Sequence, residues 1–212
     1  MEPPAQYKFG RIGGALCLDF TNTASWQGCR PTTEHLNDFG DLLRWSSENG
    51  IVDRQNASGL SAEARRNPGG ALTILNRARK LREVLYRIFV VAGEKKAPGR
   101  PDLQLLNEML AQAPLRFQVE REGVGFSCLR KPGSSEFAAL LGPVIWSAAE
   151  LLASNDLDKV KQCASDTCGW LFLDHTKNRS RRWCDMADCG SKAKAKRYYQ
   201  RKTNATHREH GC

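Results

Sequence analysis

Apolar side chains recur every three or four positions along most of the first 157 residues, which is the spacing that gives an α-helix one apolar face. The longest such pattern covers residues 70–92. Shorter patterns predict helices over residues 36–48 and 101–114. A fourth helix is expected from a cap at Ser134 or Ser135 to about residue 153, with a kink at Pro143.

Two shorter segments of this region differ from the long helical patterns. In residues 14–23, Leu16 and Phe20 lie four positions apart, which favours a short helix, although with Leu18 they would also alternate as a strand. Over residues 117–128, apolar and polar side chains alternate on both sides of a glutamate–glycine pair, and this pattern predicts a β-hairpin. The expected fold is therefore mainly α with a small β-hairpin.

The C-terminal region has a different pattern, with two short apolar runs and then a polar helix. Val160–Cys163 and Trp170–Leu173 are predicted to be strands on either side of a tight turn, where Gly169 supplies a positive φ. From Cys189 to about Arg201, a segment rich in lysine and alanine predicts a helix. A turn, a hairpin and a helix in this order form a small α+β module that resembles the treble-clef zinc folds.

The positive charge of the chain is concentrated in this C-terminal region. Residues 159–212 hold thirteen Lys and Arg against five Asp and Glu, a net charge of +8 out of +9 for the whole chain. A basic segment attached to a nearly neutral body is typical of nucleic-acid binding, and the alternative is a solubilising surface.

Four of the eight cysteines form two pairs with equal internal spacing. Four residues separate Cys163 from Cys168, and four separate Cys184 from Cys189. Two such pairs can surround one tetrahedral Zn²⁺ and leave no position open for substrate, which predicts one structural zinc ion. An iron–sulfur cluster and disulfide bonds use the same residue type and remain alternatives. His175 is expected to be a solvent-facing loop residue, because four thiolates complete the coordination sphere.

The remaining sequence features favour a cytoplasmic location. The other four cysteines are scattered, unlike the dense cysteines of small secreted domains. The first seven residues have neither the basic nor the apolar part of a secretory signal. The most apolar stretch, residues 137–153, is too short for a membrane span, so we expect no membrane association.

The C-terminal residues resemble a known family. The motif reads Cys163-x4-Cys168-Gly169-Trp170-Leu171-Phe172, then Asp174-x-Thr176-Lys177-Asn178-x-x-Arg181-Arg182-Trp183-Cys184-x-Met186-x-x-Cys189-Gly190. It is similar to the CGNR zinc finger. The motif that names this family would end in Asn-Arg, whereas this chain has Ser191-Lys192, so a bidentate donor is replaced by a point charge.

The N-terminal residues resemble the usual partner of that finger, the ABATE domain. The matching signature is Gly14-x-Leu16-x-Leu18-Asp19-Phe20-x-Asn22-Thr23. The resemblance implies a bacterial, stress-responsive transcription regulator whose finger contacts DNA. It divides the chain into a helical ABATE-like domain over residues 1–157, which would sense a ligand or dimerise, a zinc finger over residues 158–204, and a disordered tail over residues 205–212.

Basic residues between the cysteine pairs and on the last helix are the candidate nucleic-acid contacts. They are Lys177, Arg179, Arg181 and Arg182 in the loop, and Lys192, Lys194, Lys196, Arg197, Arg201 and Lys202 on the helix. Tyr198 or Tyr199 is expected to close the inner side of the helix against the turn, while Trp170 and Trp183 are expected in the core of the module. Charge alone does not distinguish DNA from RNA, so DNA is the first candidate, and an RNA-binding or ribosome-associated protein is the alternative.

Asp19, Asn22 and Thr23 form a polar cluster beside apolar neighbours in the N-terminal region. They are candidates for a ligand pocket or an interdomain contact, and the alternative is local helix and turn hydrogen bonding. No catalytic motif is present, so we expect no enzyme. The alternative is an enzyme with its site in the N-terminal domain and the zinc module as a scaffold, and a deep apolar pocket lined by Asp19 and a second titratable group would favour it. A homodimer and a small-molecule effector are both compatible with the sequence.

Overall fold

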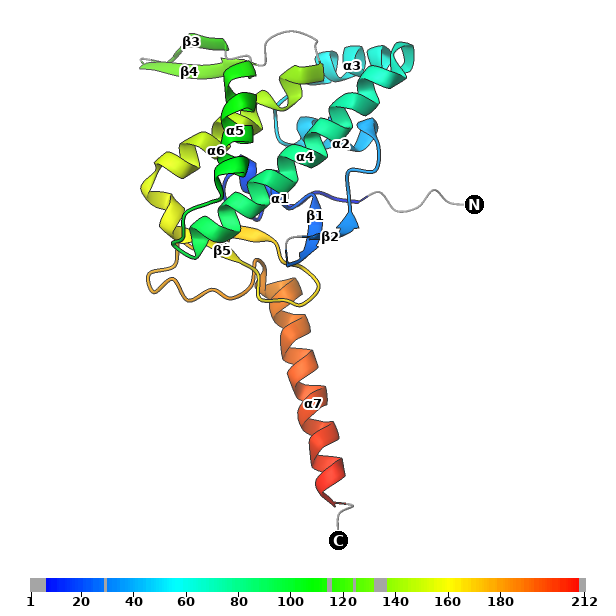
Figure 1. Cartoon of the computed structure of the whole chain (residues 1–212), viewed down its shortest axis with the longest axis vertical. Helices are drawn as coiled ribbons and strands as arrows, with labels where there is room; N and C mark the ends of the chain where they lie inside the picture. Colours follow the sequence, from blue (N-terminus) through cyan, green and yellow to red (C-terminus); the bar gives the residue numbers. More distant parts are fainter. Residues whose placement is uncertain (1–6, 29, 114–115, 124, 132–136, 210–212) are drawn as a thin grey trace.

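The computed structural model describes residues 7–28, 30–113, 116–123, 125–131 and 137–209 (Figure 1). The candidate caps Ser134 and Ser135 lie outside the described residues, as do Cys29 and Cys212.

Helices dominate the described part of the chain, as the sequence predicted. The α-helices are α1 (Leu16–Thr21), α2 (Phe39–Glu48), α3 (Arg54–Arg66), α4 (Pro68–Gly93), α5 (Arg100–Gln112), α6 (Gly142–Ala153) and α7 (Ser191–Glu209). Shorter helical turns are η1 (Phe137–Leu140) and η2 (Asn155–Lys159), both 3₁₀, and η3 (Met186–Gly190), a π-turn.

Six strands form three separate antiparallel hairpins in the described residues. They pair as β1 (Ala24–Gln27) with β2 (Arg30–Glu34), β3 (Arg116–Glu122) with β4 (Gly125–Lys131), and β5 (Val160–Gln162) with β6 (Leu171–Leu173). The β3–β4 hairpin stands at the end of the molecule opposite α7 (Figure 1). The β1–β2 and β5–β6 hairpins lie on the side of the helical body from which α7 extends, so the strands of these two hairpins position the C-terminal region.

The long helix α4 is the centre of the fold. It begins where the Asn67 side chain accepts a hydrogen bond from the backbone N–H of Gly70, with Pro68 in its first turn. It ends just before Lys95, whose φ of 60° stops the helical conformation. Its apolar face is buried against α1, α2, α5 and the β5–β6 hairpin, so one core joins the N-terminal helices to the C-terminal strands.

The sequence patterns missed α3 and both strands of the β1–β2 hairpin, and they misplaced one residue. Only Leu60 of α3 is buried, so this helix has no apolar stripe to reveal it. All of β2 except its last residue is exposed, which removes the apolar alternation of a half-buried strand. Pro143 lies in the first turn of α6, where its missing N–H costs nothing, and it therefore begins the helix instead of kinking it.

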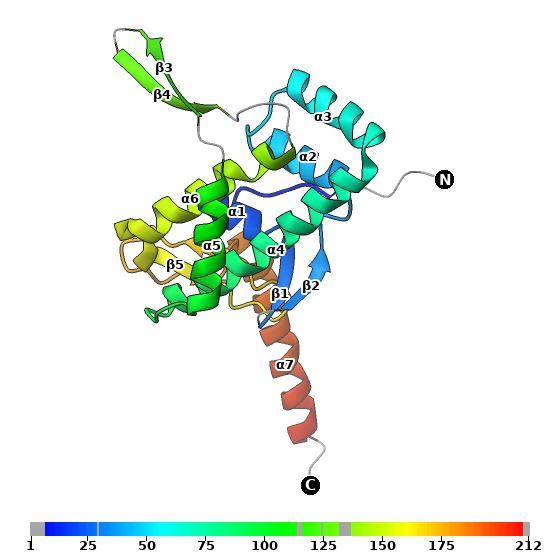
Figure 2. The same ribbon diagram turned by 45° about the horizontal axis from the view of Figure 1, so that its top comes forward.

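The last helix is longer than the sequence analysis expected. α7 continues to Glu209, so residues 205–209 are helical where we expected a disordered tail. In both ribbon views α7 projects away from the body and only its first residues lie near the rest of the chain (Figures 1 and 2). Among the described residues, no helix combines the length and the apolar character needed to cross a bilayer.

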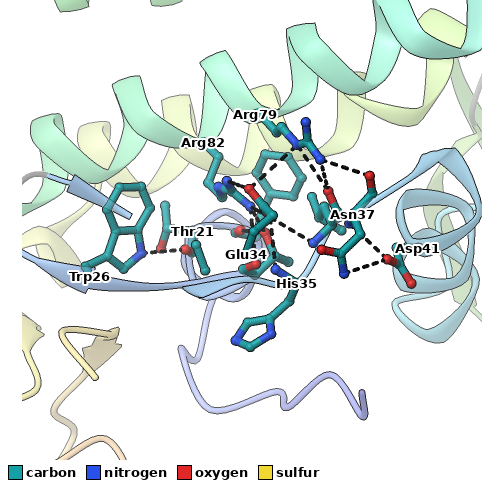
Figure 3. Close-up of polar contacts among 12 residues, drawn as sticks. Thr21, Trp26, Glu34, His35, Asn37, Asp41, Arg79 and Arg82 are labelled. Carbon is teal, nitrogen blue, oxygen red and sulfur yellow. Dashed lines mark hydrogen bonds and ion pairs between the residues drawn. The ribbon is translucent and has the colours of Figure 1, made fainter. Parts of the chain in front are cut away.

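A buried ion pair fixes the end of the β1–β2 hairpin to α4 (Figure 3). Arg82 is fully buried and donates to both carboxylate oxygens of Glu34, with an Nη1 to Oε1 distance of 2.6 Å. Glu34 also accepts the backbone N–H of Leu36 at 2.8 Å. Burial alone would raise the pKa of Glu34, but the Arg82 guanidinium lowers it below its ordinary value. The pair therefore holds strand β2 against the central helix.

Glu34→Gln should destabilise the protein by about 3 kcal/mol, because it leaves the Arg82 guanidinium buried without a counterion. Urea unfolding followed by circular dichroism measures the change. Glu94→Gln is the matched control, since it breaks the exposed pair between Glu94 and Lys96 and should leave stability close to wild type. Equal losses in the two variants would contradict this role of the pair.

Candidate metal centre and basic surface

The four paired cysteines converge on one point at the base of α7. Their sulfur atoms all lie within 4.8 Å of one another, and all four residues are buried. Neighbouring sulfurs lie 3.6 Å apart for Cys168 and Cys184, and 3.8 Å apart for Cys184 and Cys189. A tetrahedron with Zn–S bonds of about 2.3 Å has edges of about 3.8 Å, so the donor set fits one zinc ion.

The two alternative uses of these cysteines do not fit the geometry. A disulfide needs an S–S distance of about 2.05 Å, and the four cysteines are free. An iron–sulfur cluster is several atoms across and would hold the sulfurs further apart. His175 is exposed, as expected, and is not part of the group of possible ligands.

Backbone geometry explains how each cysteine pair is presented. Directly after Cys168 the chain turns back into β6 through Gly169, whose φ is 65°. A Cβ atom at Gly169 would lie 2.6 Å from the backbone oxygen of Trp26, so only glycine fits there. In the second pair, Asp185 caps the turn η3 by accepting the backbone N–H of Ala187 at 2.6 Å, and this turn carries Cys189 into α7.

A buried carboxylate that the sequence analysis did not single out organises the loop between the pairs. Asp174 is fully buried and accepts the Lys161 ammonium at 2.8 Å, the Thr176 hydroxyl at 2.6 Å and the Arg181 backbone N–H at 2.9 Å. Burial alone would raise the pKa of Asp174, but these hydrogen bonds lower it below its ordinary range. The sequence offered one sign of this role. An aspartate side chain often accepts the backbone N–H two residues further on in an Asx turn, as Asp174 does from Thr176.

Most of the candidate nucleic-acid residues lie on the surface. Lys177, Arg179 and Arg182 are exposed on the loop, and Lys192, Lys194, Lys196 and Arg197 are exposed on α7. Arg201 and Lys202 lie further along the same helix, and their side chains are outside the described part.

Arg181 is placed differently from the other basic residues. Its guanidinium donates to the backbone oxygen of Cys184 at 2.6 Å and lies 4.5 Å from the ring centre of Phe172. Because these contacts support the peptide of a metal ligand, Arg181 belongs to the packing of the finger rather than to its basic surface.

Two of the basic residues on α7 are already paired within the chain. Lys192 lies 2.7 Å from Asp188, and Lys196 pairs with Asp166. Lys194 has no carboxylate partner among the described residues. Arg197 lies 5.7 Å from the ring centre of Trp183 and Arg182 lies 5.5 Å from it, so Trp183 joins the loop to the helix.

The expected inward position of Tyr198 and Tyr199 is wrong. Their exposed fractions are 63% and 67%, and their rings meet edge to face 5.7 Å apart. α7 projects from the body after its first turn, which explains why both rings are largely exposed (Figure 1). Trp170 and Trp183 are partly buried and pack against the cysteine cluster, in line with the expected core role.

The N-terminal polar residues do not converge on one site. Asp19 accepts the backbone N–H of Gly13 at 2.8 Å, and the Thr23 hydroxyl donates to the backbone oxygen of Phe20 at 2.8 Å. Asn22 instead reaches strand β6, where its side chain accepts from the N–H of Leu171 and donates to its oxygen, both at 2.9 Å. Two of the three residues thus make local bonds, and the third joins the N-terminal helices to the finger.

A cavity of about 350 Å³ lies between the N-terminal segment, the β1–β2 hairpin and the cysteine loops. Tyr7 stacks on His35 at one side, with ring centres 3.7 Å apart. Two lysines and two aspartates line it together with Cys168, Cys184 and Cys189. These residues come from four distant segments of the sequence, so no local pattern could indicate the cavity.

The fold and the cysteine quartet together define a protein with a helical domain and a zinc finger of four thiolates. The family model "Putative stress-induced transcription regulator", or ABATE, matches residues 14–155, and the CGNR zinc finger model matches residues 159–202. The chain therefore belongs to the ABATE family and carries a CGNR zinc finger, as the sequence motifs indicated. No curated protein matches the chain.

Cys168→Ser should remove the zinc ion and unfold the C-terminal region, because thiolate binding to the metal supplies its folding energy. Metal analysis of the purified variant should give much less than one zinc per chain, with a weaker helix signal. The matched control is Cys17→Ala, which alters a buried cysteine outside the quartet and should keep the zinc. Full metal content in Cys168→Ser would contradict the ligand assignment.

Asp19→Asn should change how stability depends on pH. Burial raises the pKa of Asp19 to about 6 from an ordinary value of 3.8. The folded protein therefore binds more protons than the unfolded chain between about pH 4 and 6, and its stability falls as the pH rises through that range.

Asparagine keeps the acceptor for Gly13 and carries no charge. Relative to wild type, Asp19→Asn should therefore gain about 3 kcal/mol of stability between pH 4 and pH 7. Urea unfolding of both proteins at each pH measures the difference. The same pH dependence in both proteins would show that Asp19 is charged throughout.

Proposed function

We propose that the protein is a DNA-binding transcription regulator in which the zinc site holds α7 for insertion into the major groove. The observation that carries this proposal is the exposure of the basic helix α7 beyond its first turn. From Ser191 to Gln200 every residue is exposed except Ala193, which is partly exposed. Among the helices and strands described, α7 has its main contacts with η3.

An exposed basic helix without a buried apolar face is expected to be stabilised by a binding partner. Most helical stability in proteins comes from packing an apolar face, and α7 has no such face in its described part. Its lysines and arginines also repel one another. Phosphate groups on both sides of a groove would neutralise this charge and bind the helix on more than one face.

Duplex DNA suits α7 better than duplex RNA. An α-helix with its side chains is about 10–12 Å across, and the major groove of B-DNA is about 12 Å wide. The major groove of RNA is too narrow for side chains to read. Ala193 and Ala195 are small residues near the base of the helix, so the backbone can approach the groove closely there.

The contacts would divide into two kinds. Lys177, Arg179 and Arg182 on the loop suit phosphate oxygens, which fix orientation without reading sequence. Lys194 and Arg197 on the helix are the candidates for base edges, since neither is held by a carboxylate. Lys192 and Lys196 would first exchange Asp188 and Asp166 for phosphates.

The N-terminal domain would supply regulation, and a homodimer or a small-molecule effector of this domain remains part of the proposal. No observation favours the alternative of an enzyme. A pocket lined by Asp19 would favour an enzyme, but that carboxylate is buried against Gly13 and does not line the cavity of about 350 Å³.

Binding to duplex DNA should weaken steeply with salt. If about five phosphates are neutralised, log K should fall against log salt with a slope near −4.5. Lys177→Ala removes one of the proposed phosphate contacts, so it should weaken binding and reduce the slope by about 0.9. The control is Lys80→Ala, which removes an exposed lysine on α4 and should leave the slope unchanged.

Fluorescence anisotropy with a DNA duplex and a structured RNA at matched salt separates the two nucleic acids. Stronger binding to the RNA would replace the DNA proposal by the RNA alternative. A slope near zero for both would exclude nucleic acid as the ligand of α7. Genome-wide mapping of bound DNA then tests whether the protein occupies specific sites in the cell.

A further inference from the structure

Two aromatic rings of the N-terminal domain lie directly behind the first cysteine turn. Trp26 of β1 and Tyr86 of α4 stack with ring centres 3.8 Å apart and planes 9° from parallel. Both side chains are almost completely buried, and the Trp26 indole N–H donates to the backbone oxygen of Thr21 at 2.9 Å. The stack is therefore fixed from the N-terminal side before it meets the zinc finger.

Hydrogen bonds connect this pair to the peptide that follows a metal ligand. The Trp26 backbone N–H donates to the backbone oxygen of Cys168 at 2.9 Å. The Tyr86 hydroxyl donates to the backbone oxygen of Gly169 at 2.9 Å and accepts the Gln162 side-chain N–H at 2.7 Å. Consecutive carbonyl groups, those of Cys168 and Gly169, are thus held by groups of the other domain.

Trp170, the next residue along the chain, donates a hydrogen bond from the finger to the N-terminal domain. The Trp170 indole N–H donates to the backbone oxygen of Ala24 in β1 at 2.9 Å. This bond and the one from the Trp26 N–H to Cys168 tie the turn to β1 in both directions, and the absence of a side chain at Gly169 lets the two backbones approach closely. In the described part of the chain, the Cys184 and Cys189 loops have no such set of bonds to the N-terminal helices.

We propose that Tyr86 and Trp26 are positioning residues for the zinc ion, which means that the N-terminal domain sets how tightly the finger holds its metal. Their hydrogen bonds to this turn go to the backbone oxygens of Cys168 and Gly169. They act on the peptide groups after Cys168, and so fix the direction in which its thiolate points. Groups that orient a metal ligand in this way change metal affinity by about ten- to a hundred-fold when they are removed.

The coupling must act in both directions. If a folded N-terminal domain favours zinc binding, then bound zinc stabilises the N-terminal domain by the same free energy. Since Cys189 leads directly into α7, this link also joins the N-terminal helices to the orientation of the basic helix. The inference concerns metal binding and does not depend on whether α7 binds DNA.

Tyr86→Phe tests the inference because it removes the hydroxyl and keeps the stacked ring. Zinc release from the full-length zinc-loaded protein is measured with an excess of a colorimetric chelator. We expect release to be about ten-fold faster than from wild type. We also expect zinc to raise the melting temperature of the variant less than that of the wild type. The cobalt-substituted variant should keep the absorption of a tetrahedral thiolate site, which shows that all four ligands still bind.

Two controls separate positioning from a general loss of stability. Tyr198→Phe removes an exposed tyrosine hydroxyl on α7. Ile74→Val weakens the buried core on the same helix as Tyr86, about 18 Å away along α4. Both should release zinc at the wild-type rate. Release from Tyr86→Phe at the wild-type rate, or an equal increase in Ile74→Val, would overturn the proposal.

A second variant keeps the test decisive if Tyr86→Phe does not fold. Trp170→Phe removes the indole bond to Ala24 on the finger side of the same contact and keeps an aromatic ring in the packing against the cysteines. It should also release zinc faster than wild type, by a smaller factor. An unchanged rate in Trp170→Phe would contradict the role of the N-terminal contacts in holding the metal.

Discussion

The C-terminal region depends on the meeting of four thiolates, because little else in it could fold alone. Strands β5 and β6 have three residues each, and the loop from His175 to Ser180 is exposed. Such short elements do not exclude enough water to overcome the entropy of ordering them. The metal joins the two loops, and the buried carboxylate of Asp174 then holds the chain between them. The exposed loop thus acquires a definite shape around a small cluster of the four cysteines and Phe172.

The same region also shares apolar packing with the N-terminal helices. Val160, Leu171 and Leu173 are buried in one cluster with residues of α1, α4 and α6. Asn22 and Trp170 add polar contacts across the same boundary. Although separate family models match the two regions, their junction at η2 lies beside a continuous core. Changes in the helical body will therefore reach the metal loops through packed side chains and not through a flexible linker.

Much of this architecture could be predicted from the sequence, where a local pattern carried the information. The long apolar stripe of α4 and the equal spacing of the cysteine pairs are of this kind. α3 and β2 were missed because their side chains are mostly exposed and leave no periodic signal. The stack of Trp26 on Tyr86 and the burial of Asp174 depend on residues far apart in sequence, which pattern analysis of one chain cannot bring together. The outward position of Tyr198 was missed because nothing local indicates where a helix leaves the body.

The length of α7 has a mechanical consequence. Nineteen residues at about 1.5 Å each make a rod of about 28 Å, and it is supported only at its base. A tilt of about 10° at η3 would move the far end by about 5 Å. That displacement exceeds the 3.4 Å between neighbouring base pairs along one strand. Small angular changes at the cysteine cluster are therefore amplified into a displacement of several ångströms at the tip, which in the proposed complex with DNA would exceed one base-pair step.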